Sequence, residues 1–228
     1  MVKKDQIFFV IPAYNEGTVL VSVLKNLQKE GYKNLIVIDD GSTDNTQENM
    51  QPLNIIYLKH VVNRGQGAAL QTGIEYAKNQ DKCKYIVTFD SDGQHRIADL
   101  PHMLPLLEKN ECDIVLGSRF LKKSSRKLVP LKKKILLKGA LIITYFFSPI
   151  HLTDTHNGYR VMNKRAANQI NITMDGFEHA SEIIDEIAKH KIRYKEAPVT
   201  IDYTEYAKQK GQRISNSIKI LIKMLLRG

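Results

Sequence analysis

The chain has 228 residues, of which 43% are hydrophobic and 25% are charged, and its formal net charge at pH 7 is +10. This length and composition predict one folded domain with a sizeable core and exclude a disordered chain. The two cysteines, Cys83 and Cys112, are too few for a disulfide framework or a structural zinc site, and they fit a reducing compartment.

Apolar runs alternate with helical patterns in the first half of the chain. Strands are expected at 7–11, 35–38, 55–58, 85–89 and 113–117, and helices at 16–30, 42–49, 67–78 and 97–109. Ser42 or Thr43 is the expected cap of the short second helix. Buried strands separated by helices predict a mainly parallel sheet covered on both faces, which binds ligands at the carboxyl ends of its strands.

The second half of the chain does not repeat this pattern, so a dinucleotide-binding fold over the whole chain is not expected. It predicts an amphipathic helix at 131–147, a strand at 159–162, a helix at 177–190, an extended segment at 192–203 and a final helix at 214–226. The apolar run 7–12 is too short for a secretory signal, and the region 135–150 is shorter than the roughly 20 residues that span a bilayer. A cytoplasmic location is expected.

Positive charge is concentrated in two segments without Asp or Glu. Nine Lys and Arg lie between Ile114 and Thr153 and six follow Glu205, so the rest of the chain has 19 basic residues against all 24 acidic ones. Such clusters indicate nucleic acid, an anionic membrane or a phosphorylated substrate, and the plainer alternative is a solvated surface. Nucleic acid is not expected, because the segment 119–138 contains one aromatic residue.

Acidic residues follow two of the predicted strands. Asp39 and Asp40 follow the second strand and Asp90 and Asp92 follow the fourth, so both pairs lie at the edge where such sheets bind ligands. Carboxylates brought together repel unless a cation lies between them, and a hard divalent cation with diphosphate co-ligands meets this need. The alternative is that the aspartates are caps.

A glycine-rich segment, 63–69, opens the helix after the third strand. It lacks the Lys-Ser/Thr ending of a P-loop, and a dinucleotide fingerprint would follow the first strand. A ligand-binding role and a role in close helix packing are equally supported.

Together these blocks resemble the family 2 glycosyltransferases of the GT-A (nucleotide-diphospho-sugar transferase) fold, in the polyprenyl-phosphate branch that includes dolichol-phosphate mannose synthase. The matching blocks are 10–16, 38–44, 63–73, 89–94, 117–120 and 154–162. The resemblance implies an α/β fold, with a mainly parallel central sheet flanked by helices and with amphipathic helices near the C-terminus. It implies a single domain over 1–228, with a nucleotide-sugar half (1–118), an acceptor half (119–213) and a basic helix (214–228).

The resemblance also assigns roles to individual residues. Asp90 and Asp92, as an Asp-X-Asp motif, would hold Mg²⁺ or Mn²⁺ together with Gln94. Asp92, Arg119 and Arg160 would be catalytic, with Arg160 at the acceptor phosphate or in a structural role. The nucleotide-sugar site would comprise Pro12, Ala13, Tyr14, Glu16, Ile38, Asp39, Asp40, Asp90, Ser91, Arg119 and one or both of Lys208 and Lys210. His95 and His156 are expected to be structural or to make loop contacts.

The implied reaction is inverting transfer of a hexose from a nucleotide-sugar to a polyprenyl (undecaprenyl or dolichyl) phosphate. This acceptor is an oxyanion near neutral pH, with a second pKa of about 6, so no general base is nominated. Two alternatives stay open, namely extension of a polysaccharide or teichoic-type glycan and a non-catalytic nucleotide-sugar-binding module. Glu178, Glu182 and Glu186 lie at helical spacing, which fits packing at least as well as base catalysis.

The basic segments 131–150 and 214–226 combine lysines with apolar residues, as interfacial helices do. Lys132, Lys133, Lys134 and Lys138 are the residues expected at the membrane or acceptor. Packing against the domain, a second copy or a small membrane protein are the alternatives. The expected location is the cytoplasmic face of the membrane, where the chain would bind peripherally and serve cell-envelope glycan synthesis.

Overall fold

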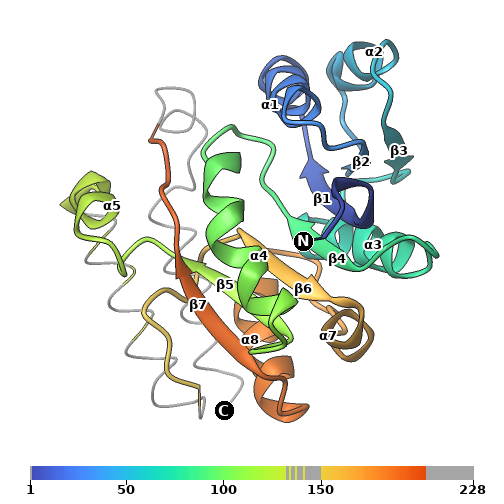
Figure 1. The fold of residues 1–228 in the computed structure, drawn as a ribbon. Coiled ribbons are helices and arrows are strands. Elements are labelled where there is room, and N and C mark those ends of the chain that lie inside the picture. Colours follow the sequence, from blue (N-terminus) through green and yellow to red (C-terminus); the bar gives the residue numbers. More distant parts are fainter. Residues whose placement is uncertain (1, 132–133, 135–136, 138–140, 142–149, 204–228) are drawn as a thin grey trace.

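The structure is a computed structural model that describes residues 2–131, 134, 137, 141 and 150–203. The described strands form one seven-stranded sheet in the order β3-β2-β1-β4-β6-β5-β7 (Figure 1). β6 is antiparallel to its neighbours β4 and β5, and the other strand pairs are parallel. The predicted final helix and most of the predicted helix at 131–147 lie outside the described residues.

The elements follow the predicted order. The strands are β1 (Ile7–Ala13), β2 (Asn34–Asp39), β3 (Ile56–Lys59), β4 (Tyr85–Thr88), β5 (Ile114–Ser118), β6 (Arg160–Asn163) and β7 (Tyr194–Pro198). The helices are α1 (Gly17–Lys29), α2 (Thr46–Met50), α3 (Gln66–Lys78), α4 (Leu100–Glu108), α5 (Lys123–Leu128), α7 (Lys164–Gln169) and α8 (His179–Lys189), with 3₁₀ turns at Lys4–Gln6 and Ile97–Asp99.

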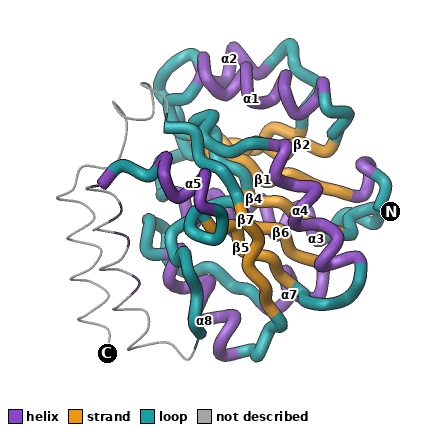
Figure 2. Tube along the Cα trace, turned by 60° about the vertical axis from the view of Figure 1, so that its left-hand side comes forward, coloured by secondary structure: helices purple, strands orange, loops and turns teal. Residues whose placement is uncertain are grey.

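β1 is apolar along its length because helices cover both faces of the sheet. Phe9 and Ile11 pack in the core with α1 and α4, whereas Phe8 and Val10 pack in a second core with α3, α7 and α8. In Figure 2 the strands run through the middle of the molecule, with α1 and α2 above them and α8 below. The predicted α/β architecture, a mainly parallel sheet flanked by helices, is confirmed.

The predicted helix at 42–49 is wrong at its start, because α2 begins at Thr46. The Ser42 N–H donates to Asp39 Oδ1 (2.8 Å) and the Thr43 N–H donates to Asn15 Oδ1 (2.9 Å). These side-chain acceptors offer the backbone an alternative to helical hydrogen bonds. Neither Ser42 nor Thr43 caps the helix, and the segment before α2 is a loop at the ligand-binding edge of the sheet.

Two short helices, α5 and α7, are absent from the sequence prediction. Asn163 starts α7, because its Oδ1 accepts from the Ala166 N–H (2.9 Å). Cys83 and Cys112 are buried, and burial raises the pKa of each thiol to about 11. Within the part of the chain that the structure describes, no helix is long and apolar enough to cross a membrane.

Candidate active site

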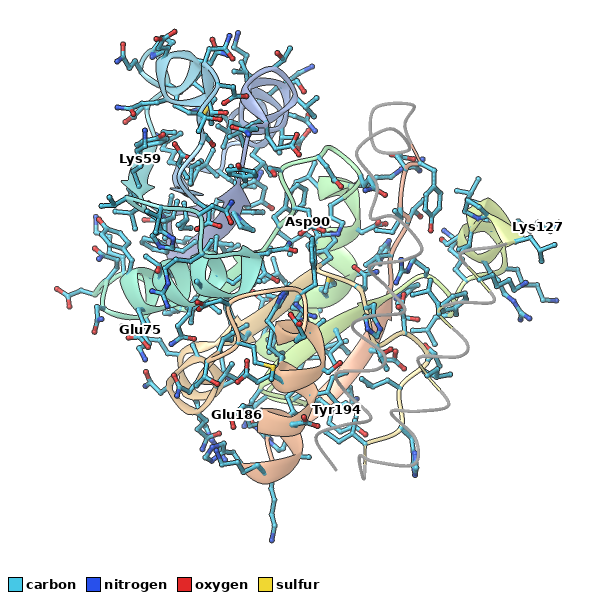
Figure 3. The ribbon with its side chains drawn as sticks, turned by 180° about the vertical axis from the view of Figure 1, so that it is seen from behind. Lys59, Glu75, Asp90, Lys127, Glu186 and Tyr194 are labelled. Atoms are coloured by element: carbon cyan, nitrogen blue, oxygen red, sulfur yellow. The ribbon has the colours of Figure 1, made fainter. Side chains whose placement is uncertain are left out.

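Loops at the carboxyl ends of β1, β2, β4 and β5 bring most of the predicted site residues to one edge of the sheet. The Asp40 N–H donates to the Ala13 carbonyl (2.8 Å), and the Arg119 N–H donates to Asp154 Oδ2 (3.0 Å). Figure 3 shows Asp90 in the middle of the molecule. Neighbouring loops are therefore fixed to one another around the fourth strand.

The first of these loops carries four predicted nucleotide-binding residues. Pro12 and Ala13 are the buried last residues of β1, and Tyr14 and Glu16 follow them. The Tyr14 side chain is 44% exposed, and the Glu16 N–H donates to Thr46 Oγ1 (3.2 Å). An exposed aromatic ring on a loop fixed by hydrogen bonds is suited to stack against a planar ligand.

Asn15 lies in the same loop and was not among the predicted site residues. Its Oδ1 accepts from the N–H groups of Thr43 (2.9 Å) and Asp44 (3.3 Å), and its own N–H donates to Ser42 Oγ (2.9 Å). Its φ of 53° lies in the left-handed region, which asparagine tolerates better than most residues. An asparagine in a loop after a strand is therefore the sequence feature that could have identified Asn15 as a residue of the site.

Asp39 and Asp40 are 0% and 3% exposed, and their carboxylates bind donors within the chain. Asp39 Oδ1 accepts from the Ser42 N–H (2.8 Å), while Asp40 accepts from the N–H groups of Arg64 (3.0 Å) and Gly65 (2.6 Å). Both carboxylates thus hold loops at the sheet edge. Their direct contact with a base or ribose stays a prediction.

The glycine-rich segment packs tightly against the protein. A Cβ on Gly73 would lie 2.6 Å from Cδ1 of Ile38, whose side chain is buried in the core under α3. The Gly67 N–H donates to the Asp175 carbonyl (2.8 Å), and a Cβ on Gly65 would lie 2.3 Å from the same oxygen. Of the two roles left open by the sequence, the geometry supports close packing. Any contact of Ile38 with a ligand would involve its backbone.

Asp90 and Asp92 follow β4, as predicted, with the buried Ser91 between them. Asp92 Oδ1 accepts from the Gln94 N–H (3.0 Å), and Oδ2 accepts from the Gln94 side-chain amide. Burial, and then the negative charge of Asp90, raise the pKa of Asp92 above its ordinary value. The two carboxylates therefore repel each other, and a cation would relieve that repulsion.

This donor set fits a hard divalent cation with ligands from outside the protein. Among the described residues, no group of three or more His, Cys, Asp or Glu side chains is placed to hold a metal ion. A cation held by Asp90 and Asp92, with Gln94 beside them, would take further oxygen ligands from phosphate groups and water. That arrangement suits an ion that arrives with a diphosphate.

His95 lies directly beneath this pair. Its Nδ1 accepts from the Asp90 N–H (3.1 Å), and its Nε2 lies 3.2 Å from Asp90 Oδ2. The ring stacks on Tyr159, with centroids 5.0 Å apart, and contacts Phe89 edge-on at 5.2 Å. Burial lowers the pKa of His95 to about 4, so the ring is neutral. His95 therefore makes a loop contact, as expected, and its partner is Asp90 of the Asp-X-Asp motif.

Arg119 and Asp154 form a buried ion pair. Arg119 Nε and Nη2 donate to the two Asp154 oxygens, both at 2.6 Å, and the arginine is 4% exposed. Burial alone would lower the pKa of Arg119, but Asp154 and, to a smaller extent, Tyr203 together outweigh that effect and raise it. Glu196 holds the loop in place by accepting from the N–H groups of Thr153 (2.9 Å) and Asp154 (3.2 Å). The guanidinium is permanently charged and fixed in position.

Arg160 is a second buried cation, 2% exposed. Burial lowers its pKa to about 10, although the charges of Asp90 and Asp154 act in the opposite direction. It therefore remains protonated at neutral pH, and its Nη1 has no partner among the described residues. Burial lowers the pKa of His156 and His179 to about 4, helped by the charges of Arg119 and Arg160 at His156 and of Arg160 at His179. The positive charge in this region therefore belongs to the arginines.

Residues 8–170 match the family model described as Glycosyl transferase family 2. The chain belongs to this family. An uncharacterised protein of Methanocaldococcus jannaschii is 40% identical over 227 residues, which cover 99% of this chain and 93% of that protein. A UDP-N-acetylglucosamine–dolichyl-phosphate N-acetylglucosaminyltransferase of Methanococcus voltae is 31% identical, over 96% of this chain and 95% of that protein.

A solved structure of glucosyl-3-phosphoglycerate synthase from Mycobacterium tuberculosis, in complex with Mn²⁺ and UDP-glucose, shares the fold of this glycosyltransferase. Its TM-score is 0.68 at 16% identity, over 97% of this chain and 78% of that chain. The predicted GT-A-like α/β fold is therefore confirmed.

The glutamates of α8 accept hydrogen bonds from the backbone of the segment that precedes this helix. Glu182 Oε1 accepts from the Thr173 N–H (3.0 Å) and Oε2 accepts from the Met174 N–H (2.9 Å), while Glu186 accepts from the Asn171 N–H (3.3 Å). Glu182 and Glu186 are also buried. These contacts agree with the packing role that the sequence left open.

Of the lysines predicted for the site, the structure describes Lys134. Lys134 is half-buried, and its N–H donates to the Pro130 carbonyl (2.9 Å). The other predicted lysines, which lie outside the described residues, are Lys132, Lys133, Lys138, Lys208 and Lys210.

Proposed function

We propose that this glycosyltransferase transfers a hexose from a nucleotide-diphospho-sugar to a polyprenyl phosphate with inversion. The proposal is supported by the relative from Methanococcus voltae, whose name states transfer to dolichyl phosphate, and which aligns over 96% of this chain. The observation that carries it is the buried cation Arg160, which lies close enough to Asp90 for their charges to interact, with the buried Arg119–Asp154 pair near His95. One site thus combines carboxylates for a cation with cations for phosphate.

The donor would occupy the edge formed by the loops after β1, β2 and β4. Tyr14 would contact the nucleoside, and Asp39 and Asp40 would hold the loops around it or reach the base or ribose. Asp90, Asp92 and Gln94 would hold Mg²⁺ or Mn²⁺, which supplies positive charge to the diphosphate leaving group. Lys208 or Lys210 would also contact the diphosphate.

The acceptor phosphate would meet Arg119 and Arg160. Both arginines remain charged at neutral pH, so they can hold an oxyanion in line with the sugar. A phosphate monoester is already ionised near neutral pH, with a second pKa of about 6. Transfer to a sugar hydroxyl would need a base, and Glu182, a candidate for that role, is buried and bonded to backbone N–H groups. These contacts favour a phosphate acceptor over a glycan hydroxyl.

We also infer that α5 and its flanks contact the anionic membrane that presents this lipid. Ser125 attaches α5 to the rest of the chain, with its Oγ 3.0 Å from Thr200 Oγ1, and Lys127 lies on α5 at the edge of the molecule (Figure 3). The exposed leucines and basic residues of this segment are Leu121, Lys122, Lys123, Arg126, Lys127, Leu128 and Leu131. Exposed leucines among cations suit an interface of acyl chains and anionic headgroups.

The reaction is tested by a panel of UDP- and GDP-hexoses against a short-chain polyprenyl phosphate and an oligosaccharide, with Mg²⁺ or Mn²⁺. Chromatography should detect a hexosylated lipid phosphate with at least one donor and no elongated oligosaccharide. Transfer only to oligosaccharide would overturn the acceptor assignment. If the chain binds the nucleotide but neither hydrolyses nor transfers the sugar of any donor, the binding-module alternative would be favoured.

The membrane contact is tested by co-sedimentation with vesicles. The chain should sediment with phosphatidylglycerol vesicles and not with phosphatidylcholine vesicles, and the double variant Leu121→Ser/Leu128→Ser should bind less. Equal sedimentation of the variant and the wild type would contradict the role of α5.

A further inference from the structure

The Asp90 carboxylate contacts two side chains, one from a distant part of the chain and one from its own loop. Gln66 Nε2 donates to Asp90 Oδ1 (3.1 Å), and His95 Nε2 lies 3.2 Å from Asp90 Oδ2. Gln66 is the first residue of α3, whereas His95 follows the Asp-X-Asp motif. The Asp92 carboxylate, by contrast, accepts hydrogen bonds from Gln94 in its own loop.

The hydrogen bond of His95 to the backbone fixes the ring beside the carboxylate. Nδ1 accepts from the Asp90 N–H (3.1 Å), and Nε2 lies 3.2 Å from Asp90 Oδ2. The ring cannot easily turn away, because it is 7% exposed and lies between Phe89 and Tyr159. The fixed ring therefore limits the orientations open to the Asp90 carboxylate.

The backbone around Gln66 is equally constrained. Gly65 has φ +118°, and its carbonyl accepts from the Ala69 N–H (3.1 Å). A Cβ on Gly67 would lie 1.9 Å from the Met174 carbonyl oxygen. The two glycines therefore allow the chain to pass close to the segment before α8 and to present Gln66 to Asp90.

The backbone at Gly158 limits the carboxylate further. A Cβ at this position would lie 2.7 and 2.8 Å from the two Asp90 oxygens, so only glycine leaves room for the carboxylate. Asp90 is thus confined by a backbone contact, by the hydrogen bond from Gln66 and by the His95 ring. Such confinement exceeds what a surface aspartate requires, and it preserves one orientation of the charged group.

We propose that Gln66 and His95 are positioning residues that hold the Asp90 carboxylate in the orientation in which it binds the divalent cation and the diphosphate. This inference rests on the proposed function. It gives the glycine-rich segment a part in the site through Gln66, although its glycines serve packing. The partners of a ligating side chain typically change metal affinity by ~10–100-fold when they are removed.

Three substitutions test the contacts of Asp90. Gln66→Leu removes the donor to Asp90 Oδ1, and His95→Leu removes the acceptor of the Asp90 N–H. The proposal predicts that each weakens binding of Mn²⁺ with UDP or GDP by ~10–100-fold. An asparagine amide reaches about as far as Nδ1 and can accept from the Asp90 N–H, so His95→Asn should recover part of the loss seen in His95→Leu.

Binding is measured by calorimetric titration with MnCl₂ and each nucleotide, beside a thermal unfolding curve for each variant. His102→Asn, at an exposed position of α4, is the matched control and should bind as the wild type does. Equal losses in His95→Leu and His95→Asn, or no loss in Gln66→Leu, would overturn the proposal. If the wild-type chain binds neither nucleotide with Mn²⁺, the proposed donor site fails instead, which distinguishes the two failures.

Discussion

The two acidic pairs that follow β2 and β4 resemble each other in the sequence and differ in the structure. Asp39 and Asp40 are 0% and 3% exposed, and they accept hydrogen bonds from backbone N–H groups. Asp90 and Asp92 are partly exposed, and the charge of Asp90 adds to burial in raising the pKa of Asp92. One pair is balanced by its own chain, and the other retains unfavourable charge repulsion.

The difference shows how a structural carboxylate is distinguished from one available to a ligand. The first pair stabilises loops, because N–H donors satisfy buried negative charge. The second pair stores an electrostatic cost that a bound cation would remove, as is common for ligand-binding carboxylates. The predictions below test this contrast, beginning with the largest expected effect.

Asp92→Ala should reduce sugar transfer at least about a hundredfold, since even the partners of metal ligands contribute 10–100-fold. The chain should stay folded, because the substitution removes a carboxylate that repels Asp90. A transfer assay over a range of Mn²⁺ concentrations, with a thermal unfolding curve, measures both effects. Asp81→Ala, at an exposed position, is the matched control. Full activity of Asp92→Ala at saturating Mn²⁺ would refute the Asp-X-Asp assignment.

Asp40→Asn, in contrast to Asp92→Ala, should mainly affect stability. It should lower the free energy of unfolding by about 2 kcal/mol, the typical value for a hydrogen bond to a charged group. The neutral amide accepts less strongly from the N–H groups of Arg64 and Gly65, and its NH₂ group faces donors. Urea denaturation measures the change. Asp81→Asn should stay within about 0.5 kcal/mol of the wild type. Unchanged stability of Asp40→Asn would contradict the structural role of Asp40.

Much of the fold follows from the sequence because its strongest signals are local. The run 7–11 is apolar on both faces of a buried strand, and the pattern at 177–190 has one apolar face, so each fits a single kind of element. The start of α2 was missed because the acceptor Asn15 lies 28 residues from Thr43. Helical periodicity contains no information about such a partner.

The same limit applies to the candidate site. Asp90 and Asp92 were predicted from their place after a strand, and the role of Arg119 from the resemblance to the family. Their partners come from elsewhere, since 24 residues separate Gln66 from Asp90 and 35 separate Arg119 from Asp154. These partners decide whether a carboxylate is free to bind a ligand, and only the folded chain brings them together.

The smallest expected effect concerns the stability of the metal-free chain as a function of pH. The folded state raises the pKa of Asp92, so protonation of this group favours folding. That stabilisation is complete below the unfolded carboxyl pKa of about 3.9 and is lost as pH rises through the higher folded value.

Asp92→Asn should therefore unfold at a slightly higher temperature than the wild type near neutral pH. The difference should shrink as pH falls toward about 4. Thermal unfolding in EDTA across this range measures it, with Asp40→Asn expected to be less stable than the wild type near neutral pH. A lower unfolding temperature for Asp92→Asn near neutral pH would show that the two acidic pairs have the same structural role.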